Sequence, residues 1–283
     1  MSAKSSYRGR LAPTPSGSLH IGHALTFARA WERARQAGGA LVLRVEDLDA
    51  PRCRPEFVSG IIEDLRWLGI DWDEGPDCGG PFAPYEQSRR LPLYLDAWRR
   101  LNAAGHIYPS AHSRRDVERA LSAPHEGEEG PVFPAQLRPE SFERVEEPGA
   151  VNWRIRLPYG RVVRFRDALA GDCEFVAGRD FGDFLVWRKD GWPSYELAVV
   201  ADDAAMGVSE VVRGADLLLS TARQILLYEA LGWAPPLFCH CPLVRDAQGR
   251  RLAKRAAGLS IAELRARGLS AGELLAMATQ WHG

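Results

Sequence analysis

The sequence lacks several features that would mark a specialised class of protein. Its 283 residues include only five cysteines, an odd number spread thinly, which favours reduced thiols over a disulfide framework. The net charge of -1 gives no global basic field, so a nucleic-acid partner would need a local basic patch. We find no apolar run long enough to cross a membrane and no apolar signal-peptide core. We therefore expect a cytoplasmic protein without a membrane anchor.

An ordinary globular composition, with 46% hydrophobic and 26% charged residues, leaves enough material for a sizeable core. Near the N-terminus, YRGRLAP predicts a short strand and a helix follows over about 19–36. The continuous apolar run at 40–45 is typical of a strand buried on both faces of a parallel sheet. Strand, helix and strand in this order form a βαβ unit, which predicts an α/β fold.

Further along the chain, apolar spacing predicts helices over 55–69 and 85–105. Residues 122–150 are rich in Pro, Glu and Gly and predict a loop. Two hairpins are expected, with turns at 158–160 and 190–191.

The pattern then returns to α/β style, with a strand ending at Asp202–Asp203 and another ending near Arg213. A helix is expected to begin around Ser220 or Thr221 and to end at Gly232. Two short helices follow, each opened by a capping box, and the paired residues are Ser260 with Glu263 and Ser270 with Glu273.

Two histidines at the start of the first helix form a candidate phosphate site. A helix N-terminus carries unpaired N–H groups and partial positive charge, and the imidazoles of His20 and His23 can add donors. Gly22 leaves room for a flat ring to lie on the backbone. The usual phosphate-loop motifs are missing, and the alternative is that the histidines only decorate a helix start. The flanking APTPSG favours the site, which would suit a nucleoside triphosphate.

Three other stretches carry groups with possible chemistry. Glu46 comes directly off the buried strand, where open α/β sheets bind ligands, and can meet an ammonium group. Asp47 and Asp49 are expected to cap the next helix. Lys254 lies in a basic loop and can neutralise charge on phosphates, although a solvated charge run is the default interpretation. CHC at 239–241 has poor spacing for zinc, and we read it as buried thiols on a strand.

These motifs together resemble a known family. HIGH at 20–23 matches the first signature of the class I aminoacyl-tRNA synthetases, and RLAKR at 251–255 resembles a degenerate second signature that keeps Lys254. The glutamyl branch of that class is resembled by RLAPTPSGSLHIGHA, LRVEDLD, YEQSRR, YELAVVADD and VVRGADLLLSTARQ. The resemblance extends from Arg8 to Gly258.

The resemblance implies a fold with a divided catalytic domain. Residues 1–105 and 181–258 would form a Rossmann-like catalytic domain, interrupted by an inserted α+β acceptor-type subdomain at 106–180. Residues 259–283 would form a short helical tail. Only these 25 residues follow Gly258, too few for an anticodon-binding domain.

The resemblance also implies a chemistry, in which ATP with Mg²⁺ activates L-glutamate and the glutamyl group passes to a nucleic acid. His20, His23 and Lys254 would be the catalytic residues, and with Gly22 they would bind ATP. Asp202 would help with the amino acid or the acceptor. The residues that match the glutamate-binding positions are Arg10, Ala12, Thr14, Glu46, Tyr195 and Arg213.

The short tail makes the chain resemble the glutamyl-Q tRNA(Asp) synthetases, truncated relatives of glutamyl-tRNA synthetase. In that family the acceptor is the queuosine base in the anticodon loop of tRNA(Asp). The alternatives are an enzyme that charges a tRNA 3′ end and a non-catalytic tRNA-binding paralogue. We expect a monomer, because no long apolar seam remains unassigned.

The chain departs from the family at the zinc site that the insertion often carries. The residues standing where the ligands would be are Ser110, His112, Phe133 and Leu137. One imidazole cannot make a structural zinc site, so we expect no zinc.

Overall fold

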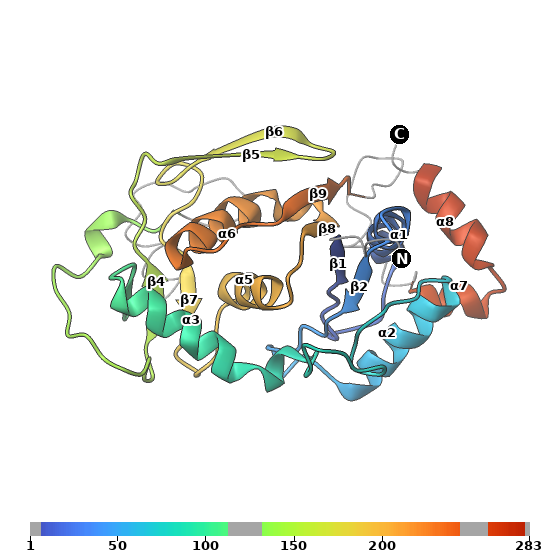
Figure 1. The fold of residues 1–283 in the computed structure, drawn as a ribbon, viewed down its shortest axis with the longest axis horizontal. Helices are drawn as coiled ribbons and strands as arrows, with labels where there is room; N and C mark the ends of the chain where they lie inside the picture. Colours follow the sequence, from blue (N-terminus) through green and yellow to red (C-terminus); the bar gives the residue numbers. More distant parts are fainter. Residues whose placement is uncertain (1–6, 113–131, 244–259, 281–283) are drawn as a thin grey trace, which may run out of the picture.

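The computed structural model describes residues 7–112, 132–243 and 260–280. The molecule is elongated (Figure 1). At one end lie strands β3 (Ile107–Ser110), β4 (Asn152–Ile155) and β7 (Leu185–Trp187), and at the other end lie the first strands of the chain and the last helices. None of the helices in these ranges is long and apolar enough to cross a membrane.

The predicted βαβ unit is confirmed. Strands β1 (Arg8–Leu11) and β2 (Ala40–Leu43) are parallel, with Arg8 opposite Ala40, and helix α1 (Ile21–Gln36) connects them. The helix begins after His20, whose backbone is extended. Three of the four residues of β2 are completely buried, as its continuous apolar run predicts.

A parallel centre is completed by β8 (Glu210–Gly214) and β9 (Leu237–Cys241), which pair in register. Strand β1 lies beside β8, where the Ser209 N–H donates to the Arg8 carbonyl at 2.9 Å. The strands form two sheets, β1-β2 and a four-stranded sheet that ends in β9-β8, and this contact places them side by side in the spatial order β2-β1-β8-β9, a Rossmann-like arrangement. The carboxyl ends of its strands meet at one edge, where such sheets bind ligands.

Helices cover this centre on both sides. One core contains buried residues of α3 (Leu91–Ala103), α5 (Tyr195–Ala205) and α6 (Leu218–Leu231). A second core joins α1 to α2 (Pro55–Trp67) and α7 (Ile261–Ala266). The helix expected over 85–105 is split into a 3₁₀ turn, η1 (Gln87–Arg89), and α3, which has Pro92 in its first turn.

The predicted hairpin around 158–160 is wrong. Strand β4 pairs with β3 and β7, whereas β5 (Val162–Asp167) pairs with β6 (Gly171–Val176) and touches β9. The chain does turn at 158–160, but β4 pairs with β3 and β7 instead of with the strand that follows the turn. Trp153 and Trp187, which face each other across β4 and β7, are both buried in the main core.

The strand expected to end at Asp202–Asp203 is also wrong, because that segment is helix α5. The Ser194 hydroxyl caps the helix by accepting the Leu197 N–H. Every residue from Glu196 to Asp203 is buried. Because the helix is buried on all sides, its apolar residues do not show the spacing of 3–4 residues that would have predicted a helix. The second predicted hairpin is thus limited to β7 and an isolated bridge from Trp187 to Pro193.

Helix α6 ends at Gly232, with φ of 70°, as predicted. It begins earlier than expected, at Leu218, after the 3₁₀ turn η3 (Ala215–Leu217). The hydroxyl of Ser220, one of the two expected caps, instead donates to Glu196.

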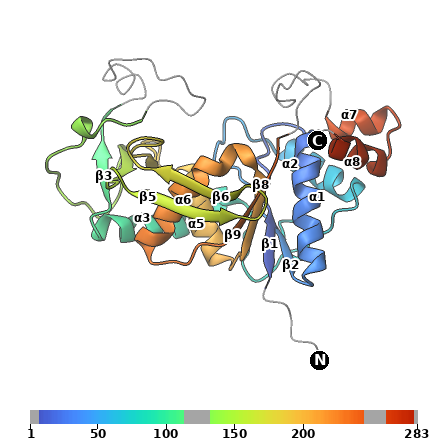
Figure 2. The same cartoon turned by 90° about the horizontal axis from the view of Figure 1, so that it is seen from above.

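Two connections tie distant segments to the parallel centre. The β5–β6 hairpin runs along α6 and its end reaches β9 (Figure 2). Helices α7 and α8 (Ala271–Gln280) pack beside α1 and α2 (Figure 1), and the Ile261 N–H donates to the Leu19 carbonyl at 2.9 Å. Both predicted capping boxes are present, as the hydrogen bonds at Ser260 and Ser270 show.

Candidate active site

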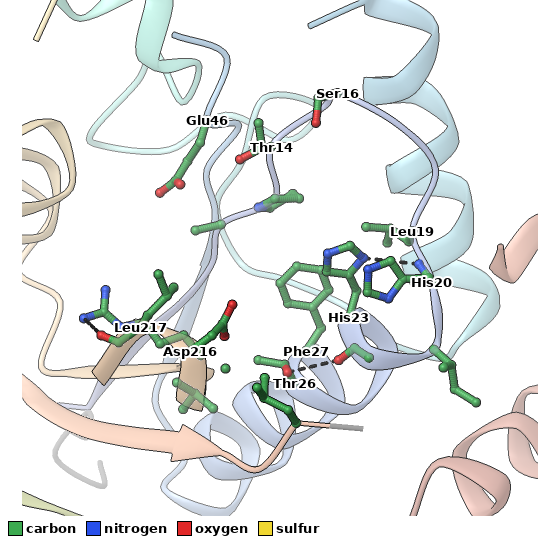
Figure 3. A pocket seen from close by; sticks show the side chains of 18 of the residues that line it. Thr14, Ser16, Leu19, His20, His23, Thr26, Phe27, Glu46, Asp216 and Leu217 are labelled. Atoms are coloured by element: carbon green, nitrogen blue, oxygen red, sulfur yellow. Dashed lines mark hydrogen bonds between the residues drawn. The ribbon is translucent and has the colours of Figure 1, made fainter. Parts of the chain in front are cut away.

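A cavity of about 680 Å³ opens at the carboxyl edge of the parallel strands, beside the N-terminus of α1 (Figure 3). Most of the predicted site residues line it, and they are Arg10, Ala12, Thr14, His20, Gly22, His23, Glu46, Tyr195 and Arg213. These residues come from β1, the loop after it, α1, the end of β2, α5 and β8. Lys254 lies outside the described residues.

The two histidines form a stacked pair at the start of α1, with ring centroids 3.7 Å apart. The backbone N–H of His20 donates to Nδ1 of His23 at 3.2 Å, so the neutral His23 ring carries its proton on Nε2. Burial, together with His20, lowers the pKa of His23 to about 3, and burial also lowers the pKa of His20. Both rings are therefore neutral at pH 7. A Cβ added to Gly22 would lie 3.3 Å from the His20 ring.

Glu46 points into the cavity, opposite Asp216 (Figure 3). It is 7% exposed, and its Oε1 accepts a hydrogen bond from Nη2 of Arg44 at 2.9 Å. Arg44 is fully buried and also donates to Asp203 at 2.6 Å. Burial raises the pKa of Glu46, while the Arg44 and Arg10 charges oppose the rise. Arg44 was not predicted from the sequence, although a charged residue directly after an apolar strand was the available signal.

Two buried arginines from neighbouring strands line the same cavity. Arg10 donates from Nη1 to the Val212 carbonyl at 2.8 Å, and its Nε lies 3.9 Å from Asp203. Arg213 donates from Nε to His240 and from Nη2 to Thr221. Nε of Arg10 and Nη1 of Arg213 have no hydrogen-bond partner among the residues that the structure describes. The cavity therefore holds cationic donors that suit a carboxylate.

Asp216 is a further acidic residue of the cavity that the sequence analysis did not single out. A Cβ at position 214 would lie 2.5 Å from its Oδ1, so Gly214 leaves space for the carboxylate. The available signal was the position of GAD at the carboxyl end of β8.

Three acids do not take the places expected for them: Asp202, and the two expected caps of α2, Asp47 and Asp49. Asp202 does not line the cavity but is fully buried, where it accepts hydrogen bonds from Gln87, Arg90 and Tyr94. Asp47 does not cap α2, whose N-cap is Arg54, but accepts hydrogen bonds from the backbone and hydroxyl of Ser88.

A buried carboxylate just after the expected insertion, Asp183, binds side chains that belong to the insertion. Asp183 accepts one hydrogen bond from the Tyr108 hydroxyl at 2.6 Å and two from Arg138 at 2.7 Å. Ser110 ends β3, and His112 lies 6.4 Å from Phe133 between ring centroids. Across residues 7–112, 132–243 and 260–280 no three His, Cys, Asp or Glu side chains are grouped to hold a metal ion.

The fold and the cavity define the catalytic domain of a class I synthetase. Residues 6–278 match the family described as tRNA synthetases class I (E and Q), catalytic domain, and the chain belongs to that family. Within it, the chain belongs with the glutamyl-Q tRNA(Asp) synthetases.

Two relatives of that name have most of their length in common with this chain. The protein from Symbiobacterium thermophilum is 51% identical over 267 residues, which cover 93% of this chain and 82% of the relative. The protein from Nitratidesulfovibrio vulgaris is 48% identical over 271 residues, which cover 94% and 83%.

A solved glutamate tRNA ligase from Elizabethkingia meningosepticum, in complex with its amino acid, has a similar structure. The TM-score is 0.76 at 29% identity, covering 90% of this chain and 54% of the ligase. This chain therefore spans about half the length of that ligase.

Proposed function

We propose that this protein activates L-glutamate with ATP and Mg²⁺ and transfers the glutamyl group to the queuosine base in the anticodon of tRNA(Asp). One observation carries the proposal: a buried acid, two buried arginines with free donors and a helix-start histidine pair line one cavity. The names of the two relatives support the acceptor.

Glutamate would lie at the carboxyl edge of the strands. Glu46 would accept from the substrate ammonium, because its second oxygen has no partner among the described residues. Arg10 and Arg213 are the cations available to the substrate carboxylates. Ala12, Thr14 and Tyr195 would form the remaining walls of the amino-acid site.

ATP would lie against the N-terminus of α1, with the neutral His20 and His23 rings as phosphate donors over Gly22. The α-carboxylate of glutamate would attack the α-phosphorus of ATP, so that glutamyl-adenylate forms and pyrophosphate leaves. The acceptor would then take the glutamyl group and AMP would leave, while Mg²⁺ bound with ATP would offset the phosphate charge. The protein supplies position and charge rather than covalent catalysis.

Lys254 would stabilise the departing phosphates. Leu243 lines the cavity, and Ser260 forms a β-bridge with His20, so the described residues that precede and follow 244–259 both lie at the cavity. We expect Lys254→Ala to slow glutamate-dependent exchange of pyrophosphate into ATP about a hundredfold, with thermal unfolding unchanged. A normal exchange rate would remove Lys254 from the mechanism.

We also propose the domain division that the resemblance implies. Residues 1–105 and 181–258 would form the catalytic domain, 106–180 an inserted α+β subdomain without zinc, and 259–283 a helical tail. The protein would act as a cytoplasmic monomer, with the anticodon loop of tRNA(Asp) bound beside the cavity.

The acceptor distinguishes our proposal from a 3′-end-charging enzyme and from a non-catalytic tRNA-binding protein. Labelled glutamate should attach to tRNA(Asp) whose terminal adenosine has been removed, and should not attach to tRNA(Asp) that lacks queuosine. The reverse pattern would establish 3′-end charging. Absence of both adenylate formation and transfer, with and without tRNA, would support a binding protein.

A further inference from the structure

His240 is the fourth of the five residues of β9 and lies between the cavity arginine Arg213 and the β5–β6 hairpin. Its side chain is fully buried. The adjacent residues Cys239 and Cys241 face the other side of the strand, because side chains alternate along a strand. Nε2 of His240 faces Nε of Arg213 at 3.1 Å and Oγ1 of Thr221 at 3.0 Å, and Nδ1 faces Oδ2 of Asp167 at 2.6 Å. The imidazole thus connects a carboxylate at the end of the hairpin to a cation of the cavity.

Asp167 is fixed at the end of the hairpin. Its Oδ1 accepts the backbone N–H groups of Leu169 and Ala170 at 2.9 and 2.8 Å. The backbone N–H of His240 lies 3.1 Å from both carboxylate oxygens, and Oδ2 also accepts from the imidazole. Although burial alone would raise it, the hydrogen bonds from Ala170 and His240 hold the pKa of Asp167 below its usual value. Asp167 is therefore an ionised acceptor at pH 7.

These contacts specify which imidazole nitrogen carries the proton. An arginine Nε can only donate, so Nε2 of His240 must accept and the proton must be on Nδ1, directed at Asp167. Burial and the Arg213 charge lower the pKa of His240 to about 4, which agrees with a neutral ring.

The fork of Arg213 is thereby fixed on two sides. Nε is held by His240, and Nη2 donates to Thr221 Oγ1 at 2.6 Å. Nη1 is buried without a partner in the described part of the chain, although Arg213 lines the cavity. Fixing two nitrogens of a planar group also fixes the third.

We propose that Asp167 and His240 are positioning residues that orient Arg213, so that its Nη1 is directed at the carboxylate of the amino-acid substrate. The inference rests on the proposed glutamate site. It adds that glutamate affinity depends on Nε2 of His240 acting as a hydrogen-bond acceptor, because Asp167 keeps the imidazole proton on Nδ1.

Two substitutions of His240 test this contact. Glutamine places its side-chain oxygen near the position of Nε2 and can still accept from Arg213, whereas asparagine reaches only the position of Nδ1 and can bond only Asp167. We expect H240N to raise the KM for glutamate roughly tenfold to a hundredfold and H240Q to raise it less than about threefold. The KM for ATP should change less than twofold in both variants. Equal losses in the two variants, or a milder loss in H240N, would overturn the proposal.

A double-mutant cycle tests the tautomer. In D167N, the amide oxygen remains with the backbone N–H groups of Leu169, Ala170 and His240. The NH₂ group then meets the imidazole and moves its proton to Nε2, where it faces Arg213 and the Thr221 hydroxyl. D167N should therefore raise the KM for glutamate about tenfold in the parent protein and have no further effect in H240Q. Additive losses would overturn the proposal, and D167N provides the test if the His240 variants do not fold.

Cys241→Ala is the matched control, because it changes the opposite face of the same strand and should leave the KM for glutamate unchanged. The parent protein is measured first by pyrophosphate exchange. If it does not activate glutamate, the proposed function fails; if it does and H240N keeps the parent KM, only the positioning role fails.

Discussion

Glu46 and Asp183 are two buried carboxylates with opposite hydrogen-bonding states. Asp183 is 1% exposed and accepts four hydrogen bonds, from Tyr108, twice from Arg138 and from the Leu157 backbone. Glu46 is 7% exposed and accepts one, from Arg44, among the described residues. One acid is saturated by the protein, whereas the other keeps an oxygen directed into the cavity.

The difference shows how to separate a structural acid from a binding acid of similar burial. A saturated carboxylate stabilises the contacts between its own elements and has little capacity for a ligand. An unsaturated one next to a cavity retains capacity for a cationic group of a ligand.

Asp183→Ala should produce the largest effect and act on stability alone. The substitution leaves the Arg138 guanidinium and the Tyr108 hydroxyl without their shared acceptor, at a cost of about 3–5 kcal/mol in the free energy of unfolding. Urea unfolding followed by tryptophan fluorescence measures this loss. The KM for glutamate, measured where the variant is folded, should be unchanged, and a raised KM would contradict the separation.

Glu46→Gln should produce the opposite pattern. The amide oxygen still accepts from Arg44, but the negative charge for the substrate ammonium is lost, so glutamate-dependent pyrophosphate exchange should fall roughly tenfold to a hundredfold. The urea midpoint should change little. Wild-type exchange by this variant would show that the free oxygen of Glu46 does not bind substrate.

Asp64 on α2 sharpens the comparison, because it is buried and unsaturated but does not line the cavity. Arg265, at 3.9 Å, is the ion-pair partner of its carboxylate, and no group among the described residues donates a hydrogen bond to that carboxylate. Burial raises its pKa to about 6, with Arg265 opposing the rise. A pKa above the unfolded value of about 3.9 means that stability falls as pH rises from about 4 to 6 and remains reduced above pH 6.

Asp64→Asn should therefore stabilise the protein by about 1 kcal/mol at pH 8 and have no effect at pH 3.5. Unfolding curves at the two pH values provide the measurement. Glutamate activation should be unaffected, since only an unsaturated carboxylate next to the cavity is expected to bind a ligand. Reduced activation would mean that free oxygens elsewhere also matter.

The fold could be predicted from the sequence where signals were local. The strand-helix-strand start, the end of α6 at Gly232 and the capping boxes at Ser260 and Ser270 all follow from neighbouring residues. The partners of β4 and β5 could not be predicted, because strand pairing depends on packing between distant segments. A run buried on every side, such as 196–203, carries no period that distinguishes a helix from a strand.

The candidate site was predictable as a set of positions but not as a set of interactions. Motif matches identified Arg10, Glu46 and Arg213, and all three line the cavity. Nothing in the order of the residues indicated that Arg44 binds Glu46 or that His240 lies between Asp167 and Arg213, because these contacts join segments far apart in the chain.

The contacts between the start of α7 and the start of α1 give the last two helices a structural role. Ser260 bridges His20, and the next residue donates its N–H to the Leu19 carbonyl. The start of α7 therefore supports the turn that carries the histidine pair, and α8 packs along α1. A shortened chain that stopped before Ser260 would leave that turn unsupported, so the last two helices stabilise the end of the cavity where we propose that ATP binds.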